Sequence, residues 1–81
     1  MDKQKIYEKL NRSPANIRFE EICGYALDFG FTYKGGKGSH RIFVREGLRE
    51  LLNFQNVKGM VKSYQVRQFV KIIEKYDLAE D

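Results

Sequence analysis

The fold of this chain is decided by residues 31–55, which read FTYKGGKGSHRIFVREGLRELLNFQ. Aromatic and β-branched residues, which favour strands, predict three of them in this stretch: Phe31–Tyr33, His40–Arg45 and Glu50–Gln55. Glycines at 35, 36 and 38 predict a turn between the first two strands, and residues 46–49 form the second connection. Because both connections are short, we expect the strands to form an antiparallel meander.

Apolar residues at helical spacing flank the meander on both sides. A helix is predicted from about Arg18 to Phe29, with Gly30 as its C-terminal cap. A second helix is predicted to start at a capping Ser63 and to run to about Tyr76. A short amphipathic helix over residues 2–11 should precede both, because Ser13-Pro14 ends it.

This order predicts a two-layer α+β domain, with a three-stranded antiparallel sheet and the two long helices on one of its faces. It is the αβββα arrangement of double-stranded-RNA-binding domains, plus an extra short N-terminal helix. We expect one domain over residues 1–81, made of an N-terminal helical extension, 1–14, and a core, 17–76. The predicted buried residues are Ile22, Ala26, Leu27, Phe31, Ile42, Val44, Leu52, Phe54, Val66, Phe69, Val70 and Ile73.

Length and composition exclude several classes of protein. A chain of 81 residues cannot enclose a deep substrate cavity, so its function is expected on an open surface that suits a polymer or a partner protein. No segment resembles a membrane span or a signal peptide, which predicts a cytoplasmic protein. A single cysteine, Cys23, excludes an internal disulfide and a cysteine-rich zinc site, and we expect it to be a buried thiol.

The net charge of +4 is unevenly distributed. Residues 1–30 are neutral overall, residues 31–75 hold ten basic and three acidic side chains, and residues 76–81 carry three acidic ones. A basic region of this kind attracts phosphate backbones, although a basic face can also serve solubility alone. Arg67, Lys71 and Lys75 are spaced four apart on the last helix, where a bound anion would relieve their mutual repulsion.

The chain's one histidine, His40, ends the glycine-rich basic loop. Alternation along the strand puts Arg41 and Arg45 on one face and His40, Ile42 and Val44 on the other. A neutral imidazole can take the proton of a ribose 2′-OH, and Lys34 or Lys37 can stabilise the charge that develops on the phosphoryl oxygens. No metal is required, and Tyr33, Lys37 and Tyr64 remain candidates for a second proton-transfer group.

Two motifs in this order resemble the HicA family of toxins: Gly38-Ser39-His40-Arg41-Ile42-Phe43, after a helix ending in Gly30-Phe31, and Lys62-Ser63-Tyr64-Gln65-Val66-Arg67-Gln68-Phe69. The resemblance covers roughly residues 17–76. It implies an mRNA interferase of a bacterial toxin–antitoxin pair, with a fold like that of double-stranded-RNA-binding domains, a catalytic histidine at His40 and a HicB antitoxin that masks the active site. The chain departs from the family at residues 52–56, where many members carry a further histidine, and in its extra N-terminal helix.

Three hypotheses follow. In the first, the chain is the toxin of a type II toxin–antitoxin system: a metal-independent endoribonuclease that cleaves mRNA, needs no cofactor and is neutralised by a HicB-type antitoxin. In the second, it is a non-catalytic RNA-binding module of the same fold. In the third, it is a protein-interaction domain for an acidic partner. The first assigns catalysis to His40 and RNA binding to Lys34, Lys37, Ser39, Arg41, Lys62, Arg67 and Lys71.

Overall fold

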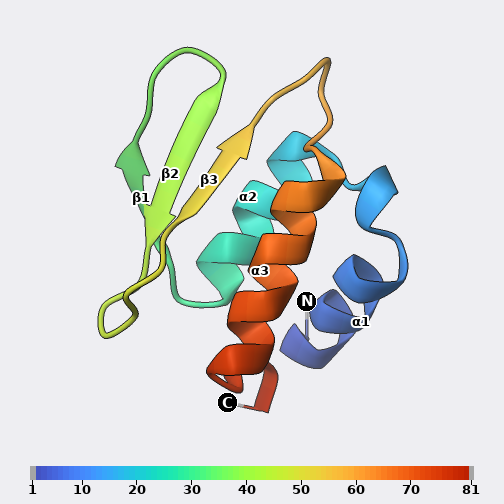
Figure 1. The fold of residues 1–81 in the computed structure, drawn as a ribbon, viewed down its shortest axis with the longest axis vertical. Coiled ribbons are helices and arrows are strands. Elements are labelled where there is room, and N and C mark those ends of the chain that lie inside the picture. The colour runs from blue at the N-terminus through green and yellow to red at the C-terminus, as the bar shows by residue number, and fades with distance from the viewer. Residues whose placement is uncertain (1, 81) are drawn as a thin grey trace.

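The computed structural model describes residues 2–80 as a three-stranded sheet packed against helices (Figure 1). Its helices are α1 (Lys3–Arg12), α2 (Phe19–Asp28) and α3 (Ser63–Lys75), with single 3-10 turns at Pro14–Asn16 and Leu78–Glu80. Its strands are β1 (Thr32–Gly35), β2 (His40–Val44) and β3 (Leu52–Gln55). The predicted order of elements is confirmed, and their ends differ from the predictions by one or two residues.

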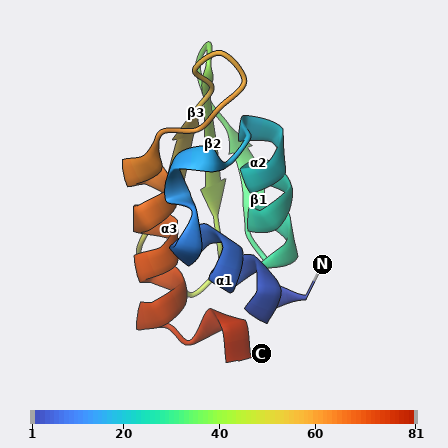
Figure 2. The same ribbon diagram turned by 90° about the vertical axis from the view of Figure 1, so that its right-hand side faces the viewer.

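The sheet is an antiparallel meander in the order β1-β2-β3, as the short loops predict. Helices α2 and α3 cover one of its faces, and the other face is open (Figures 1 and 2). Helix α1 lies on the side of the helical layer away from the sheet, toward the viewer in Figure 2, and packs against α3 and the C-terminal 3-10 turn. The predicted α+β arrangement is therefore confirmed, with α1 added to the helical side.

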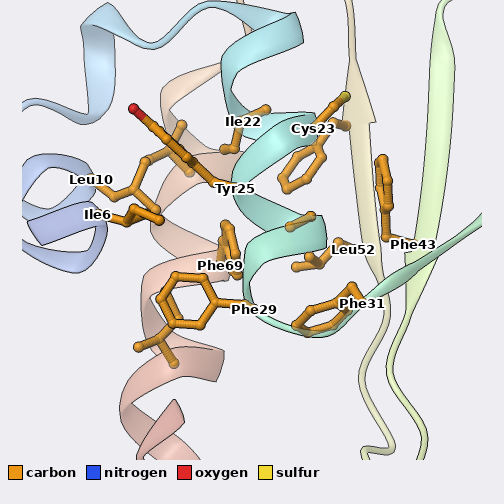
Figure 3. Packing of buried hydrophobic residues seen from close by; sticks show 14 of the residues in the cluster. Ile6, Leu10, Ile22, Cys23, Tyr25, Phe29, Phe31, Phe43, Leu52 and Phe69 are labelled. Atoms are coloured by element: carbon orange, nitrogen blue, oxygen red, sulfur yellow. The ribbon is translucent and has the colours of Figure 1, made fainter. Parts of the chain in front are cut away.

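An aromatic cluster around Phe69 holds the sheet to the helices (Figure 3). The centre of the Phe69 ring lies 5.5 Å from the centre of the Phe29 ring, in an edge-on arrangement. It lies 5.9 Å from the centres of the Phe31 and Phe54 rings. Offset and edge-on pairs of this kind add about 0.5–1.5 kcal/mol each to the burial of their area. Because these rings come from the C-terminal cap of α2, from α3, from β3 and from the segment before β1, one cluster joins both layers.

Most of the predicted core is buried, but three residues are not. Leu27 is 56% exposed. The buried residues of α2 and its C-terminal cap lie on another side of the helix and are spaced three and four apart: Phe19, Ile22, Ala26 and Phe29. Ile42 and Val44 are only half-buried, and the residue between them, Phe43, is buried instead. The register explains this, since Phe43 pairs with the buried Leu52 of β3 and must share its face.

Helix α1 covers apolar surface of the helical layer. Ile6 and Leu10 are fully buried against the core, as their spacing predicts (Figure 3). The Tyr7 hydroxyl donates to Glu74 Oε2 at 2.6 Å, and Lys9 pairs with Glu21, so polar contacts tie α1 to both long helices. The α1 helix is therefore an integral part of the packing.

The predicted cap of α3 is wrong by one residue. Lys62 occupies the cap position and Ser63 is the first helical residue, and the Lys62 side chain makes no capping hydrogen bond. At its other end the helix stops at Lys75, one residue before the predicted Tyr76.

Within residues 2–80, no helix has both the length and the apolar character needed to cross a bilayer.

Candidate functional site

The β1–β2 hairpin fixes the position of His40 through its glycines. Gly36 has φ +155°, and a Cβ at this position would lie 2.3 Å from the carbonyl oxygen of His40. The His40 N–H donates to the Lys37 carbonyl at 3.0 Å, and the Asn56 N–H donates to the Ser39 carbonyl at 2.8 Å. The close approach across the turn therefore requires glycine, and the turn holds the start of β2 beside the end of β3.

The His40 side chain lies on the open face of the sheet. Its residue is half-buried, so the ring is outside the core and accessible to solvent. The ring atom Nδ1 lies 3.1 Å from Oδ1 of Asn53, an exposed residue of β3. Ile42 and Val44 follow at alternate positions on the same face, as the strand pattern predicts. The His40 ring therefore lies on an uncovered sheet face and has Asn53 as a hydrogen-bond partner.

Three predicted RNA-binding residues surround His40 in the hairpin. Lys34, Lys37 and Ser39 are all exposed, and no buried contact holds their side chains away from a ligand. Lys34 lies at an irregularity in the β1–β2 register, between Tyr33 and Gly35. The hairpin that ends in His40 therefore carries two exposed lysines and an exposed hydroxyl.

A further lysine at this end of the molecule was missed by sequence reasoning. Residues 57–60 form a turn beside the hairpin, in which Lys58 has φ +53° and is exposed. In the sequence, Lys58-Gly59 marks only a break between a strand and a helix. The segment joining β3 to α3, which contains Lys58 and Lys62, lies at the same end of the molecule as the β1–β2 hairpin (Figures 1 and 2).

Arg41 does not share the face of His40. It points to the helical side, where Nη1 lies 3.1 Å from Glu20 Oε1 and the guanidinium carbon lies 4.9 Å from the centre of the Phe19 ring. The hydrogen bond to Glu20 raises the pKa of Arg41 further above its ordinary value. Arg45 likewise turns to the helical side and donates to the Phe29 carbonyl at the end of α2. Both arginines contribute contacts to the scaffold.

The basic residues of α3 are spread away from the open face. Arg67 and Lys71 line a groove against α1, and Arg67 Nη1 lies 3.4 Å from Ser63 Oγ. Lys75 pairs with Glu50 at 2.6 Å. Of the predicted RNA-binding residues of this part of the chain, Lys62 is the N-cap residue of α3.

The candidates for a second proton-transfer group are now distinguishable. The Tyr33 ring lies 5.7 Å from that of Phe43, on the helical side of the sheet and opposite to His40. Tyr64 is exposed on the first turn of α3. Lys37 lies in the hairpin itself, where its carbonyl accepts a hydrogen bond from the His40 N–H.

Three other features of the described residues concern the cysteine, metal ligands and the groove on the helical side. Cys23 is a buried thiol, as predicted, and burial raises the pKa of that thiol. Among residues 2–80 there is no group of three or more histidine, cysteine or acidic residues that could hold a metal ion. A groove of about 440 Å³ between α2 and the strands is lined by Leu27, Tyr33 and Arg41 among others, but not by His40.

Comparison with known proteins finds no matching family model, no matching curated protein and no matching solved structure. The resemblance to HicA toxins therefore stays a prediction that rests on the motifs around His40 and Ser63.

Proposed function

We propose that this protein is a metal-independent endoribonuclease of the HicA type, in which His40 is the catalytic acid–base residue. The observation that carries the proposal is the place of the imidazole: it lies on an uncovered sheet face at the start of β2, in the hairpin that also carries exposed Lys34 and Lys37. A cationic hairpin attracts a polyanion, and a histidine within it meets the sugar–phosphate backbone.

The chemistry needs no cofactor. The imidazole takes the 2′-OH proton, the O2′–P bond forms, and the P–O5′ bond breaks as the leaving 5′ oxygen gains a proton. The products are a 2′,3′-cyclic phosphate and a 5′-hydroxyl, and nothing is oxidised or reduced. The Lys37 ammonium is suited to stabilise the phosphoryl oxygens or to protonate the leaving oxygen.

The proposal extends to the type of fold. The order α2-β1-β2-β3-α3, with both helices on one sheet face, supports an αβββα core like that of double-stranded-RNA-binding domains. In this proposal the hairpin end, with Lys34, Lys37, Ser39, Lys58 and Lys62, is the RNA-binding surface. Arg41, Arg67 and Lys71, which lie elsewhere, contribute to the general positive field.

A protein partner is part of the proposal, because a ribonuclease that cleaves mRNA in the cytoplasm needs an inhibitor. We propose a HicB-type antitoxin that covers the open sheet face. Half-buried Ile42 and Val44 lie on this face beside His40. A partner that buries these apolar side chains also covers the imidazole.

A non-catalytic RNA-binding module is the second candidate. The observation in its favour is that the hydrogen-bond partner of the His40 ring is a neutral amide, with no second histidine in the chain to complete an acid–base pair. In that case the imidazole contacts phosphate or 2′-OH without moving a proton.

Cleavage and binding of a labelled single-stranded RNA by wild type, His40→Ala and Gln55→Ala, in EDTA, separate the two candidates. Gln55 pairs directly with His40 across the strands and is the matched control. The ribonuclease proposal predicts cleavage by wild type and Gln55→Ala, and none by His40→Ala, with binding retained by all three. Salt-sensitive binding without cleavage by any protein would support the module instead.

A further inference from the structure

The hydrogen bond between His40 and Asn53 bears on which ring nitrogen carries the proton. His40 lies directly opposite Gln55, and Ile42 lies opposite Asn53, so Asn53 is the diagonal neighbour of His40 on the open face. The atom of Asn53 that faces Nδ1, at 3.1 Å, is its carbonyl oxygen. Because a carbonyl oxygen accepts hydrogen bonds and cannot donate, this contact favours the neutral tautomer with its proton on Nδ1.

We propose that Asn53 is a positioning residue that holds His40 in the Nδ1–H tautomer and thereby presents an unprotonated Nε2 to the substrate. The tautomer of a histidine is set by the hydrogen bond that its other nitrogen makes. In a neutral imidazole in water the proton resides mostly on Nε2, so a ring without this partner mostly presents an N–H group where a base is needed. The catalytic consequence rests on the proposed ribonuclease function, whereas the tautomer is a property of the free protein.

An amide suits this role beside a polyanion. When Nε2 takes a proton, the Nδ1–H of the resulting imidazolium still donates to the Asn53 carbonyl, so the contact persists in both protonation states. A carboxylate at this position would hold the same tautomer but would repel an incoming phosphate. The amide fixes the ring without adding negative charge to the surface that RNA approaches.

The position of Asn53 within β3 supports a role beyond the fold. Asparagine is depleted in strands, where β-branched and aromatic residues pack better. Asn53 lies between the buried Leu52 and Phe54, and its own side chain is exposed on the open face. Packing therefore does not require asparagine here, and the contact with His40 supplies a reason for it.

Ring-nitrogen NMR of the free protein tests the proposal directly. His40 is the only histidine in the chain, so long-range ¹⁵N–¹H correlations of an imidazole are assigned without ambiguity. At a pH where the ring is neutral, wild type, Asn53→Asp and Gln55→Ala should show the Nδ1–H tautomer. Asn53→Ala should shift toward the Nε2–H tautomer. An Nε2–H ring in wild type, or a tautomer that Asn53→Ala leaves unchanged, would overturn the proposal.

Cleavage kinetics separate this inference from the function on which it rests. Asn53→Ala should lower kcat about tenfold or more, a part of the roughly 10²–10⁴-fold that a positioned acid–base group contributes, and leave the Kd for RNA unchanged. If cleavage depends on His40 but Asn53→Ala cleaves at the wild-type rate, the positioning role fails and the ribonuclease stands. If wild type does not cleave, the ribonuclease fails, and the NMR experiment still decides the tautomer.

Discussion

Replacement of glycine by alanine should have opposite effects at two positions of this chain. A Cβ at Gly36 would lie 2.3 Å from the carbonyl oxygen of His40 and 2.9 Å from its carbonyl carbon. Because both are backbone atoms, no side-chain rotation relieves the overlap, and the hairpin must move. A Cβ at Gly24, which lies exposed within α2, meets nothing within 4 Å.

The magnitudes follow from these surroundings. Gly24→Ala should stabilise the protein by roughly 0.5–1 kcal/mol, because glycine in a helix loses more backbone freedom on folding than alanine. Gly36→Ala should destabilise it by at least about 1–3 kcal/mol, the cost of a disfavoured backbone conformation, before any cost of displacing the strand. In a domain of this size about 1 kcal/mol shifts Tm by roughly 4–8 °C.

Thermal and urea unfolding, followed by circular dichroism, measure both variants against wild type. We expect Gly24→Ala to melt above wild type and Gly36→Ala to melt below it. Since Gly36 sets the position of His40, Gly36→Ala should also lose RNA cleavage at temperatures where it is still folded. A Gly36→Ala protein as stable as wild type, or a Gly24→Ala protein less stable than wild type, would refute the reasoning.

Three further predictions concern a surface carboxylate, the N-terminal helix and the basic hairpin. Hydrogen bonds from Lys75 and Tyr76 lower the pKa of Glu50 from 4.5 to about 2, so the stability they confer is present above pH 4.5 and is lost as the pH falls toward 2. Urea unfolding of Glu50→Gln should therefore depend less on pH in this range, and equal dependence in both proteins would contradict the assignment. Leu10→Ala should cost about 2–5 kcal/mol in urea unfolding, because Leu10 is fully buried; a loss near zero would mean that α1 is dispensable. Lys37→Ala should weaken RNA binding and reduce the slope of log Kd against the logarithm of the salt concentration by about one. Arg41→Ala should change that slope little, because Arg41 faces Glu20. Equal slopes for the two variants would contradict the proposal that RNA binds at the face that carries His40.

The helices were the most predictable part of the fold. In α3 a single apolar stripe leaves one possible orientation, and Val66, Phe69, Val70 and Ile73 are all buried as predicted. In α2 the apolar residues extend around more of the helix, and the stripe alone does not exclude Leu27. Its exposure depends on where the sheet lies, which local periodicity does not contain.

The sequence of β2 alone could not predict which of its faces points toward the core. Ile42, Phe43 and Val44 are all apolar, so their alternation does not choose a face. The strand β3 does choose, because Leu52 and Phe54 are apolar and Asn53 is polar, and the register then carries Phe43 inward. A prediction that had paired the two strands first would have avoided placing Ile42 and Val44 in the core.

The candidate site was predictable only where it is local in sequence. His40, Lys34, Lys37 and Ser39 belong to one hairpin, and their proximity follows from its glycines. The contact with Asn53 depends on the β2–β3 register, and the sequence signal for it is only an asparagine inside a strand. The separation of Arg41 from His40 was predicted by alternation, but its ion pair with Glu20 requires the packing of α2 on the sheet.

The central claim is that His40 cleaves RNA through the ribose 2′-OH without a metal. The most direct measurement is the end chemistry of fragments that wild type and His40→Ala release from an RNA in EDTA, beside a strand of the same sequence with 2′-deoxy sugars. We predict 2′,3′-cyclic phosphate and 5′-hydroxyl ends from wild type, none from His40→Ala, and an intact deoxy strand. Cleavage of the deoxy strand, or the same fragments from His40→Ala, would contradict the claim.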